Sequence, residues 1–207
     1  MYVRAKMTAK PVTATPDLSI LDASALMKNN NIKQLPVLEN GKLVGLVSQL
    51  NIQQFAPSQA TSLSVFEMNY LLAKATVRDA MTPNPITVEA GALIEEAAVL
   101  MRNHKVQCLP VTENGKMVGI ITETDIFDAF IEIVGFKDPG SRLTVRAEDA
   151  PGMLSKVTGV IGAQGVNISH ASVFRGQNGY SDMVLRVNTN NLAPVIEALK
   201  AAGLEVL

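Results

Sequence analysis

The amino-acid sequence contains an internal repeat in which the two copies lie 74 residues apart. Residues 3–52 align with residues 77–126 without a gap, and 21 of the 50 aligned pairs are identical. Self-similarity at one period indicates that the chain builds the same structural unit twice. Because a unit of this size buries too little apolar surface to be stable alone, we expect the two copies to pack against each other.

Each copy has the pattern of a helix, a strand, a second helix, a β-hairpin and a third helix. In the second copy, segment 76–79 reads as a capping box for the first helix, and segment 86–88 as a short strand. Apolar residues then recur at helical spacing over 94–101. Asn114-Gly115 lies between two apolar runs and suits a tight turn with positive φ, which predicts the hairpin.

The end of the second hairpin carries the first candidate for chemistry, Thr122-Glu123-Thr124-Asp125. Backbone N–H groups are free where a helix begins, which suits an anion, and the Asp125 carboxylate can accept hydrogen bonds from both hydroxyls of a ribose. The segment therefore predicts a nucleotide site. A Thr-x-x-Asp sequence is also a capping box that begins helices with no ligand, and this alternative stays open. The two are compatible, because one hydroxyl can cap the free helix and meet a phosphate when a ligand binds.

The order Met-Thr-x-x-Pro, Leu-Pro-Val, Asn-Gly-Lys-x-Val-Gly and Thr-x-x-Asp, present or closely matched in both copies, resembles a tandem pair of CBS domains over residues 1 to about 133. The resemblance implies two α/β repeats related by a pseudo-two-fold axis, with two clefts between their sheets. It also implies a regulatory ligand of the adenine-nucleotide type, such as AMP, ADP, ATP or S-adenosylmethionine, and no required cofactor.

The two copies differ where this resemblance places the ligand. Asn51 has in the first copy the position that Asp125 has in the second. Its neutral amide binds a ribose diol less tightly than a carboxylate does. We therefore expect the Asp125 cleft to bind more tightly. Family members often carry a basic residue before Leu-Pro-Val that reaches a phosphate, and Lys33 has this position in the first copy, where the second has Gln107. Pseudo-two-fold packing could bring Lys33 to a nucleotide held by Asp125; the alternative is a solvated surface lysine.

The resemblance thus gives two sets of expected site residues. Those of the tighter cleft are Ile86, Thr87, Val106, Pro110, Thr122, Asp125 and Lys33. Those of the weaker cleft are Val12, Pro36, Ser48 and Asn51.

Residues 57–75, between the copies, are expected to form a loop and a helix that begins near Ser64. After the second copy, residues 135–140 are expected to form a linker. From residue 141 onward, the apolar periodicity predicts strand, helix, strand, strand, helix and strand. The order βαββαβ is ferredoxin-like, with helices on one face of an antiparallel sheet, so the whole chain is of the α+β class.

The segments Asp149-Ala150-Pro151-Gly152-Met153-Leu154 and Gly165-Val166-Asn167-Ile168 resemble the two signatures of an ACT domain. That resemblance implies sensing of a small amino acid at a site shared between paired domains. Gly152 would let backbone N–H groups approach a ligand carboxylate at a helix start, and Asn167 could hold the ligand from a neighbouring domain. The expected residues are Asp149, Gly152, Asn167 and Ile168. The alternative is that Pro-Gly is only a turn, and that the domain dimerises without a ligand.

Two CBS repeats followed by one ACT domain resemble the acetoin-utilisation protein B family of bacteria, which implies a regulatory role in acetoin or related small-carbon metabolism. The expected boundaries are 1–56 for the first repeat, 57–75 for the linker and helix, 76–134 for the second repeat, 135–140 for the linker and 141–207 for the ACT domain.

Composition restricts the function further. The 18 basic and 19 acidic residues give no basic field for nucleic acid, and no apolar run approaches the length needed to span a bilayer. A single cysteine, Cys108, excludes an internal disulfide, so we expect a cytoplasmic protein. His104 and His170 fall in different domains with no metal-ligand spacing around them, and Cys108 reads as a small buried hydrophobe. We therefore assign no catalytic and no metal-binding residue.

Three functions stay open. The first is a ligand-sensing regulator that forms a homodimer and acts on a partner enzyme or regulator. The second is a dimerisation or scaffold module with empty clefts. The third, and the weakest, is an enzyme that hydrolyses a nucleotide.

Overall fold

The structure is a computed structural model that describes residues 1–55, 74–176 and 179–207. The chain divides into two compact units, Met1–Ile126 and Phe127–Leu207, and each is described by itself. The helix expected to begin near Ser64 lies outside the described residues.

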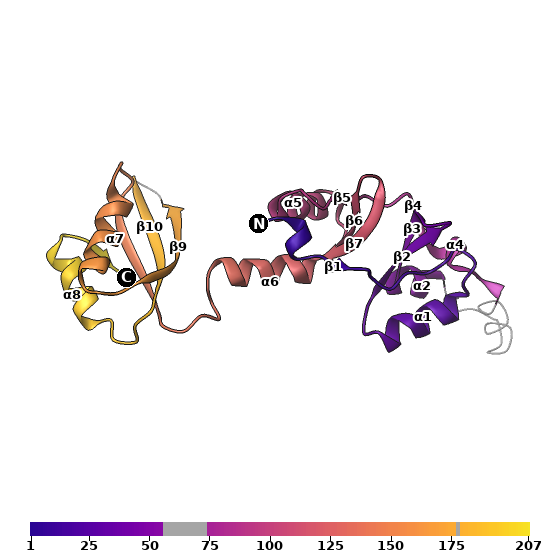
Figure 1. Ribbon diagram of the computed structural model, residues 1–207, viewed down its shortest axis with the longest axis horizontal. Coiled ribbons are helices and arrows are strands. Elements are labelled where there is room, and N and C mark those ends of the chain that lie inside the picture. The colour runs from indigo at the N-terminus through magenta and orange to yellow at the C-terminus, as the bar shows by residue number, and fades with distance from the viewer. Residues whose placement is uncertain (56–73, 177–178) are drawn as a thin grey trace. The chain divides into compact units, whose positions relative to one another are not determined.

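The first unit contains both copies of the repeat, and Figure 1 labels its elements. In chain order they are η1 (Val3–Ala5), β1 (Thr8–Ala9), α1 (Ile20–Asn29), β2 (Gln34–Glu39), β3 (Lys42–Ser48), α2 (Gln49–Phe55), α4 (Val77–Ala80), β4 (Thr82–Pro83), β5 (Val88–Glu89), α5 (Ile94–His104), β6 (Cys108–Glu113), β7 (Lys116–Thr122) and the start of α6 (Glu123–Ile133). The strand expected at 86–88 is shorter and later than predicted, since β5 begins at Val88.

Each copy of the repeat contributes its N-terminal strand to the sheet of the other copy. Thr8 of β1 pairs with Ile120 of β7, which gives a sheet of order β1-β7-β6-β5. Thr82 of β4 pairs with Leu46 of β3, which gives a sheet of order β2-β3-β4. The two pairs have the same positions in the repeat with the copies exchanged. This exchange is the pseudo-two-fold relation that the family resemblance implied.

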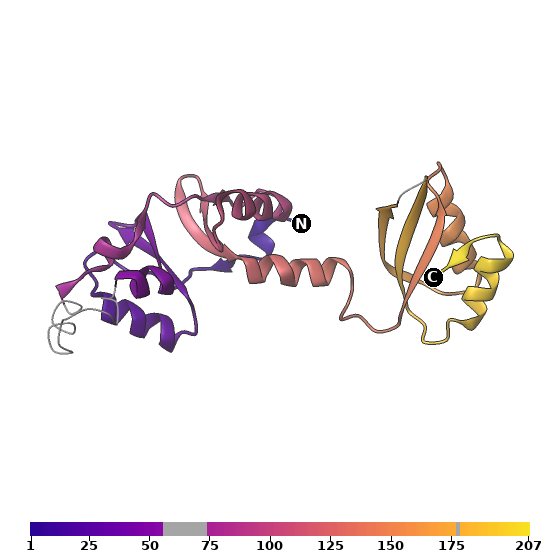
Figure 2. The same ribbon diagram turned by 180° about the vertical axis from the view of Figure 1, so that it is seen from behind.

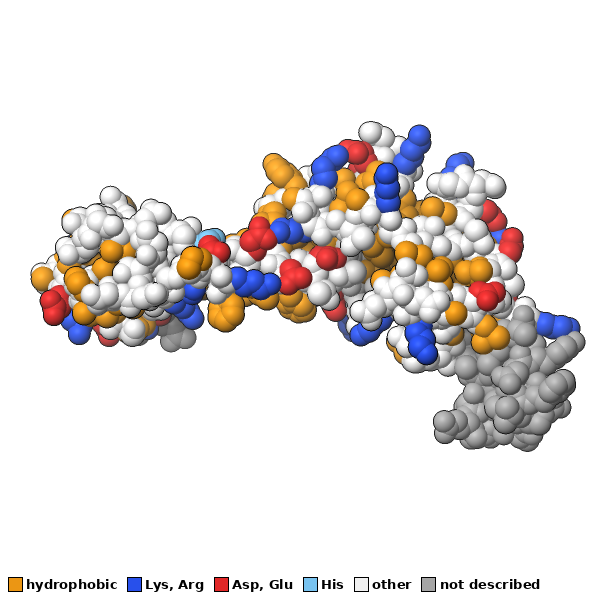
Figure 3. Space-filling model, turned by 60° about the horizontal axis from the view of Figure 1, so that its bottom comes forward, with side chains coloured by type: hydrophobic (Ala, Val, Ile, Leu, Met, Phe, Trp, Pro, Cys, Tyr) orange, Lys and Arg blue, Asp and Glu red, His pale blue; other side chains and the backbone are white. Residues whose placement is uncertain are grey.

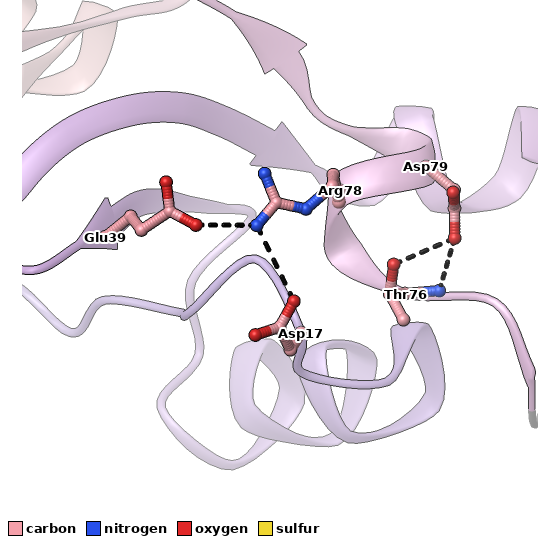
Figure 4. A network of polar contacts seen from close by, with 5 residues as sticks. All are labelled: Asp17, Glu39, Thr76, Arg78 and Asp79. Carbon is pink, nitrogen blue, oxygen red and sulfur yellow. Dashed lines mark hydrogen bonds and ion pairs between the residues drawn. The ribbon is translucent and has the colours of Figure 1, made fainter.

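Ion pairs follow the same exchange. The Nη2 of Arg78 in the second copy lies 2.6 Å from Oε1 of Glu39 in the first, and 3.6 Å from Oδ1 of Asp17 (Figure 4). Arg4 in the first copy pairs with Glu113 in the second. The partners are partly exposed, so solvent screens each pair and its contribution to stability is small. Their value is geometric, because they join the first turn of each copy to the hairpin of the other.

Local sequence explains where the elements begin and turn. Asp79 accepts hydrogen bonds from the N–H and the hydroxyl of Thr76, both at 2.8 Å, so the predicted capping box is confirmed (Figure 4). Asn114 and Gly115 have φ values of 52° and 73° between β6 and β7, which confirms the predicted hairpin turn.

Equivalent apolar positions of the two copies form the core of the first unit. Ala23 and Met27 of α1, and Ala97 and Met101 of α5, are all buried. They recur at helical spacing, so each helix turns one stripe inward. The predicted helical periodicity is confirmed in both copies.

The second unit has the predicted βαββαβ order. Its elements are β8 (Ser141–Glu148), α7 (Met153–Ala163), β9 (Ile168–Arg175), β10 (Tyr180–Val187), α8 (Ala193–Ala201) and β11 (Glu205–Val206). The strands form an antiparallel sheet of order β11-β8-β10-β9. Figures 1 and 2 show α7 and α8 on the same face of this sheet, and their buried residues Ile161 and Leu199 join Val145 and Leu185 in one core. The opposite sheet face is not covered by these two helices.

Candidate functional site

A cavity of about 580 Å³ lies in the first unit, where the start of α6 faces loops of the first repeat. This volume is within the range of sites for small molecules and cofactors. The second copy contributes Gln107, Ile120, Thr122, Glu123, Thr124 and Asp125. The first copy contributes Thr8, Lys10, Pro11, Val12, Asn30, Asn31, Ile32, Lys33 and Gln34. The exchange of segments between copies therefore builds one cavity from both.

Asp125 and Thr122 form a helix cap at one side of this cavity. Oδ2 of Asp125 accepts hydrogen bonds from the N–H and from the hydroxyl of Thr122, both at 2.8 Å. Thr122 Oγ1 accepts in turn from the N–H of Asp125 at 3.4 Å, so the predicted capping box is formed. Both side chains are half-buried, and the hydrogen bonds of the described residues leave Asp125 Oδ1 able to accept from a ligand.

Two lysines of the first copy line the same cavity. Lys33 and Lys10 both line it and both are exposed, so their ammonium groups can move toward an anion. The carbonyl of Lys33 accepts a hydrogen bond from the N–H of Gln49 at 2.8 Å, which holds the backbone just before β2. A carboxylate and two exposed cations in one cavity suit a ligand that carries both a ribose and a phosphate.

The residues expected for the tighter cleft separate into two groups. Lys33, Thr122 and Asp125 line the same cavity. The other four, Ile86, Thr87, Val106 and Pro110, do not line it. Pro110 is buried in β6, opposite Ile120 of β7.

The residues expected for the weaker cleft also separate. Val12 lies in the cavity of Asp125, together with Pro11 and Ile32. Ser48 and Asn51 form their own cap at the start of α2: Asn51 Oδ1 accepts from the N–H and the hydroxyl of Ser48 at 2.9 and 2.6 Å. Pro36 is buried in β2, opposite Leu46.

Sequence reasoning missed Lys10, Asn30, Asn31 and Gln34 as lining residues. A signal for Lys10 was available. The pseudo-two-fold argument that placed Lys33 opposite Asp125 applies equally to the Lys10–Val12 loop, because a cleft built between the copies needs that loop from the first copy.

The residues expected to bind a ligand in the second unit lie at its turns. Gly152 is the N-cap of α7 with a φ of 84°, a conformation that favours glycine. Asp149 pairs with Arg175 at 3.5 Å. Asn167 donates its N–H to Asn188 Oδ1 at 2.9 Å, and Ile168 follows as the first residue of β9.

The remaining reactive side chains have structural surroundings. Cys108 is buried, and burial raises the pKa of its thiol to about 12, so it stays protonated at neutral pH. His104 is the last residue of α5, and His170 lines a cavity of the second unit beside Asp138. Across residues 1–55, 74–176 and 179–207, no three His, Cys, Asp or Glu residues are grouped to hold a metal ion. In the same ranges, no helix is both long and apolar enough to cross a membrane.

Sequence comparison identifies the domains. Residues 3–56 and 77–132 match the family model of the CBS domain, and residues 141–204 match that of the ACT domain. The CBS matches cover more than half of the chain.

Among curated proteins, the chain is 33% identical over 141 residues to inosine-5'-monophosphate dehydrogenase of Korarchaeum cryptofilum, which covers 68% of this chain and 26% of that enzyme. It is 25% identical over 142 residues to the CBS domain-containing protein YhcV of Bacillus subtilis, which covers 69% of this chain and 92% of YhcV. The chain thus spans about a quarter of the dehydrogenase, but nearly all of YhcV.

Solved structures give similar results. The CBSX2 complex with AMP is 29% identical, with a TM-score of 0.54 over 64% of this chain and 97% of that one. A proposed acetoin utilization protein (AcuB) of Vibrio cholerae is 28% identical, with a TM-score of 0.56 over 67% of this chain and 96% of that one. The CBS domain pair of MJ0100, in complex with 5'-methylthioadenosine and S-adenosyl-L-methionine, is 26% identical, with a TM-score of 0.52 over 63% of this chain and 95% of that one.

Proposed function

Because this chain belongs to the CBS-domain family and continues into an ACT domain, we propose that it is a regulatory sensor of an adenine nucleotide or adenosyl derivative. The ligand occupies the 580 Å³ cavity, with its ribose on Asp125 and its phosphate or other polar end toward Lys33 and Lys10. A relative was solved with AMP and another with S-adenosyl-L-methionine, which supports this class of ligand.

One observation carries the proposal. Asp125 and Lys33, which the sequence singled out from different copies of the repeat, line one cavity. The carboxylate of Asp125 has an oxygen left to accept hydrogen bonds from a vicinal diol. The two exposed lysines can pair with the phosphate groups of ligands that carry phosphate chains of different length. The same cap without a ligand would serve a purely structural role, so binding must be measured directly.

Isothermal titration calorimetry with AMP, ADP, ATP and S-adenosylmethionine tests the proposal. We expect at least one of the four to bind with saturation, and we expect Asp125→Ala to abolish or strongly weaken that binding. A full set of titrations without binding, or an unchanged affinity in Asp125→Ala, would contradict it. Mass spectrometry of small molecules that co-purify with the chain would narrow the choice of ligand.

The C-terminal domain supplies a second input in this proposal. A small amino acid binds at the turn formed by Asp149 and Gly152, with Asn167 and Ile168 contributed by a paired domain of a homodimer. Support comes from the ACT match and from the left-handed conformation of Gly152 at the N-terminus of α7. A thermal-shift panel of amino acids tests it, and the absence of any shift would count against an amino-acid sensor.

The metabolic setting follows from one similarity. The likeness to the Vibrio cholerae protein favours a regulatory role, through a partner enzyme or regulator, in acetoin-type small-carbon metabolism. The alternative function is a dimerisation module whose clefts bind no ligand. The hydrogen bonds between Thr122 and Asp125 favour it, because they give both side chains a structural role as a helix cap. A stable dimer in sedimentation experiments, combined with negative titrations, would select this alternative.

A further inference from the structure

A second cavity, of about 210 Å³, lies on the open face of the sheet in the second unit. Strands β8, β9 and β10 form its floor, and the C-terminal part of α6 with the segment that follows it forms a wall. Its lining includes Phe130, Phe136, Arg142, His170, Phe174 and Arg186. The volume has room for about seven waters, or for a small organic molecule of that bulk.

Three basic residues form a row across the floor of this cavity. Arg186 of β10 is directly opposite Arg142 of β8 and, on its other side, directly opposite His170 of β9. Like charges directly opposite each other on one sheet face destabilise the sheet. The row therefore requires acidic or anionic groups close by.

The next charged row of the same face is balanced by its own strands. Arg146 of β8 donates two hydrogen bonds to the carboxylate of Asp182 on β10, at 2.8 and 3.0 Å. The row of Arg142 and Arg186 has no acidic residue in register on these strands. A compensating anion must come from elsewhere.

The segment after α6 supplies part of this compensation. Asp138 places Oδ2 3.3 Å from Nδ1 of His170, and its backbone carbonyl accepts a hydrogen bond from Nη2 of Arg186. Gly135 packs so closely on the His170 ring that a Cβ there would overlap it. The segment is thus seated on the row by specific contacts.

Compensation by Asp138 is incomplete. The Nε of Arg186 is buried and has no hydrogen-bond acceptor among the described residues. The row also has two guanidinium groups, of Arg142 and Arg186, and Asp138 brings one carboxylate to it. A buried donor without an acceptor is costly, so the site favours one further acceptor with a single negative charge.

The rest of the lining is apolar except for Ser172. Phe130, Phe136 and Phe174 line the cavity together with the basic row, and all three are more than half exposed, with values of 61%, 73% and 54%. Figure 3 shows hydrophobic side chains on the surface along α6. Exposed aromatic side chains beside a cavity are typical of a ligand-binding surface.

We propose that this cavity binds a small monocarboxylate with an aromatic or branched apolar body and no amino group. The carboxylate accepts hydrogen bonds from Arg186 and Arg142, and the apolar body lies among the three phenylalanine rings. An ammonium group would be repelled by the basic row, so the ligand class differs from an amino acid. The site is separate from both the Asp125 cavity and the Asp149–Gly152 turn.

Calorimetry of the full chain with 3-phenylpropionate and 4-methylpentanoate tests the proposal. We expect saturable binding of at least one, and at least tenfold weaker binding of 3-phenylpropanamide, L-phenylalanine and inorganic phosphate. Failure of both carboxylates to bind would overturn the proposal. Equal affinity for the amide would show that no anion is recognised, and equal affinity for phosphate would show that the apolar lining is not used, so either result would also overturn it.

Matched variants locate the binding. Arg142→Gln should weaken the binding of 3-phenylpropionate at least tenfold. Lys156→Gln, which also replaces an exposed cation by a neutral amide but lies on α7, should not. Phe130→Ala should weaken it several-fold, whereas Phe127→Ala, 65% exposed on the same helix, should not. All four side chains are on the surface or at the rim, so folding should be retained. An unchanged affinity in Arg142→Gln and Phe130→Ala would place the ligand elsewhere and overturn the assignment.

Discussion

Asn51 accepts hydrogen bonds from the N–H and the hydroxyl of Ser48 through Oδ1, at 2.9 and 2.6 Å. In the second copy of the repeat, Asp125 holds Thr122 in the same way through Oδ2, with both distances at 2.8 Å. An asparagine therefore builds the same helix start as an aspartate in this fold. The two positions differ in charge and in hydrogen-bonding capacity, and the helix cap can be kept while the charge is changed.

Asp125→Asn should weaken nucleotide binding without removing the cap of α6. A hydrogen bond to a charged group contributes about 1.5–3 kcal/mol, so we expect a loss of roughly tenfold or more in calorimetry. Asp79→Asn is the matched control, because Asp79 makes the same cap with Thr76 outside the cavity. Equal losses in both variants would show that the effect is on folding.

Asn51→Asp should strengthen binding at the equivalent position of the first copy. The carboxylate can accept hydrogen bonds from both hydroxyls of a ribose, whereas the amide offers one acceptor group and one donor group. We expect the calorimetric stoichiometry or the affinity of the weaker cleft to rise for AMP. No change in either would indicate that the acid alone does not determine which cleft binds.

Lys33→Gln should weaken the binding of phosphorylated ligands selectively. The second copy has glutamine, Gln107, at the position equivalent to Lys33, so the backbone should tolerate glutamine at position 33. AMP and ATP should lose affinity, ATP more than AMP, while adenosine should not. Lys28→Gln, an exposed lysine of α1 outside the cavity, should bind all three normally. Equal weakening of adenosine would contradict a phosphate contact.

Gly119→Ala should destabilise the first unit by disturbing the exchanged strand. A Cβ at position 119 would lie 2.9 Å from the backbone oxygen of Thr8 and 2.7 Å from Sδ of Met7. Overpacking of this kind costs about 1–3 kcal/mol, which urea unfolding can measure. Gly91→Ala is the control, because its Cβ would meet nothing within 4 Å. Similar unfolding midpoints for the two variants would contradict the tight approach of β1 to β7.

The pair of Arg146 and Asp182 should make the stability of the second unit depend on pH in acid. Hydrogen bonding to Arg146 lowers the pKa of Asp182 below 3.8. A carboxyl whose pKa is lower in the folded state stabilises the fold above its unfolded pKa, and this contribution is lost as the pH falls through the folded value. Urea unfolding between about pH 2 and pH 6 should therefore show a smaller acid loss in Asp182→Asn. Parallel profiles for the two proteins would contradict the assignment.

Much of the fold followed from local patterns. The spacing of Ala97 and Met101 predicted the buried stripe of α5, and Asn114-Gly115 predicted the turn between β6 and β7. The order of periodicities after residue 141 predicted the βαββαβ unit. These features depend on neighbours within one or two turns of chain, which a sequence records directly.

The lining of the Asp125 cavity did not follow in the same way. Thr122 and Asp125 could be found because they form one local motif, yet Val12 was assigned to the other cleft and Lys10 was not singled out. Ile86 and Val106, expected beside Asp125, do not line its cavity. The cause is the exchange of N-terminal segments between the copies. Because of it, part of the lining around Asp125 comes from the first copy and not from the second, to which Asp125 belongs.

Repetition, turn chemistry and helix starts could thus be read from the order of residues, since each is set by contacts that are close in the chain. The partner of Asp125 across its cavity and the alignment of Arg142, Arg186 and His170 depend on packing and strand register between distant segments. Hydrophobic burial drives that packing but is non-directional, so which side chains meet became evident only when the folded copies were seen together.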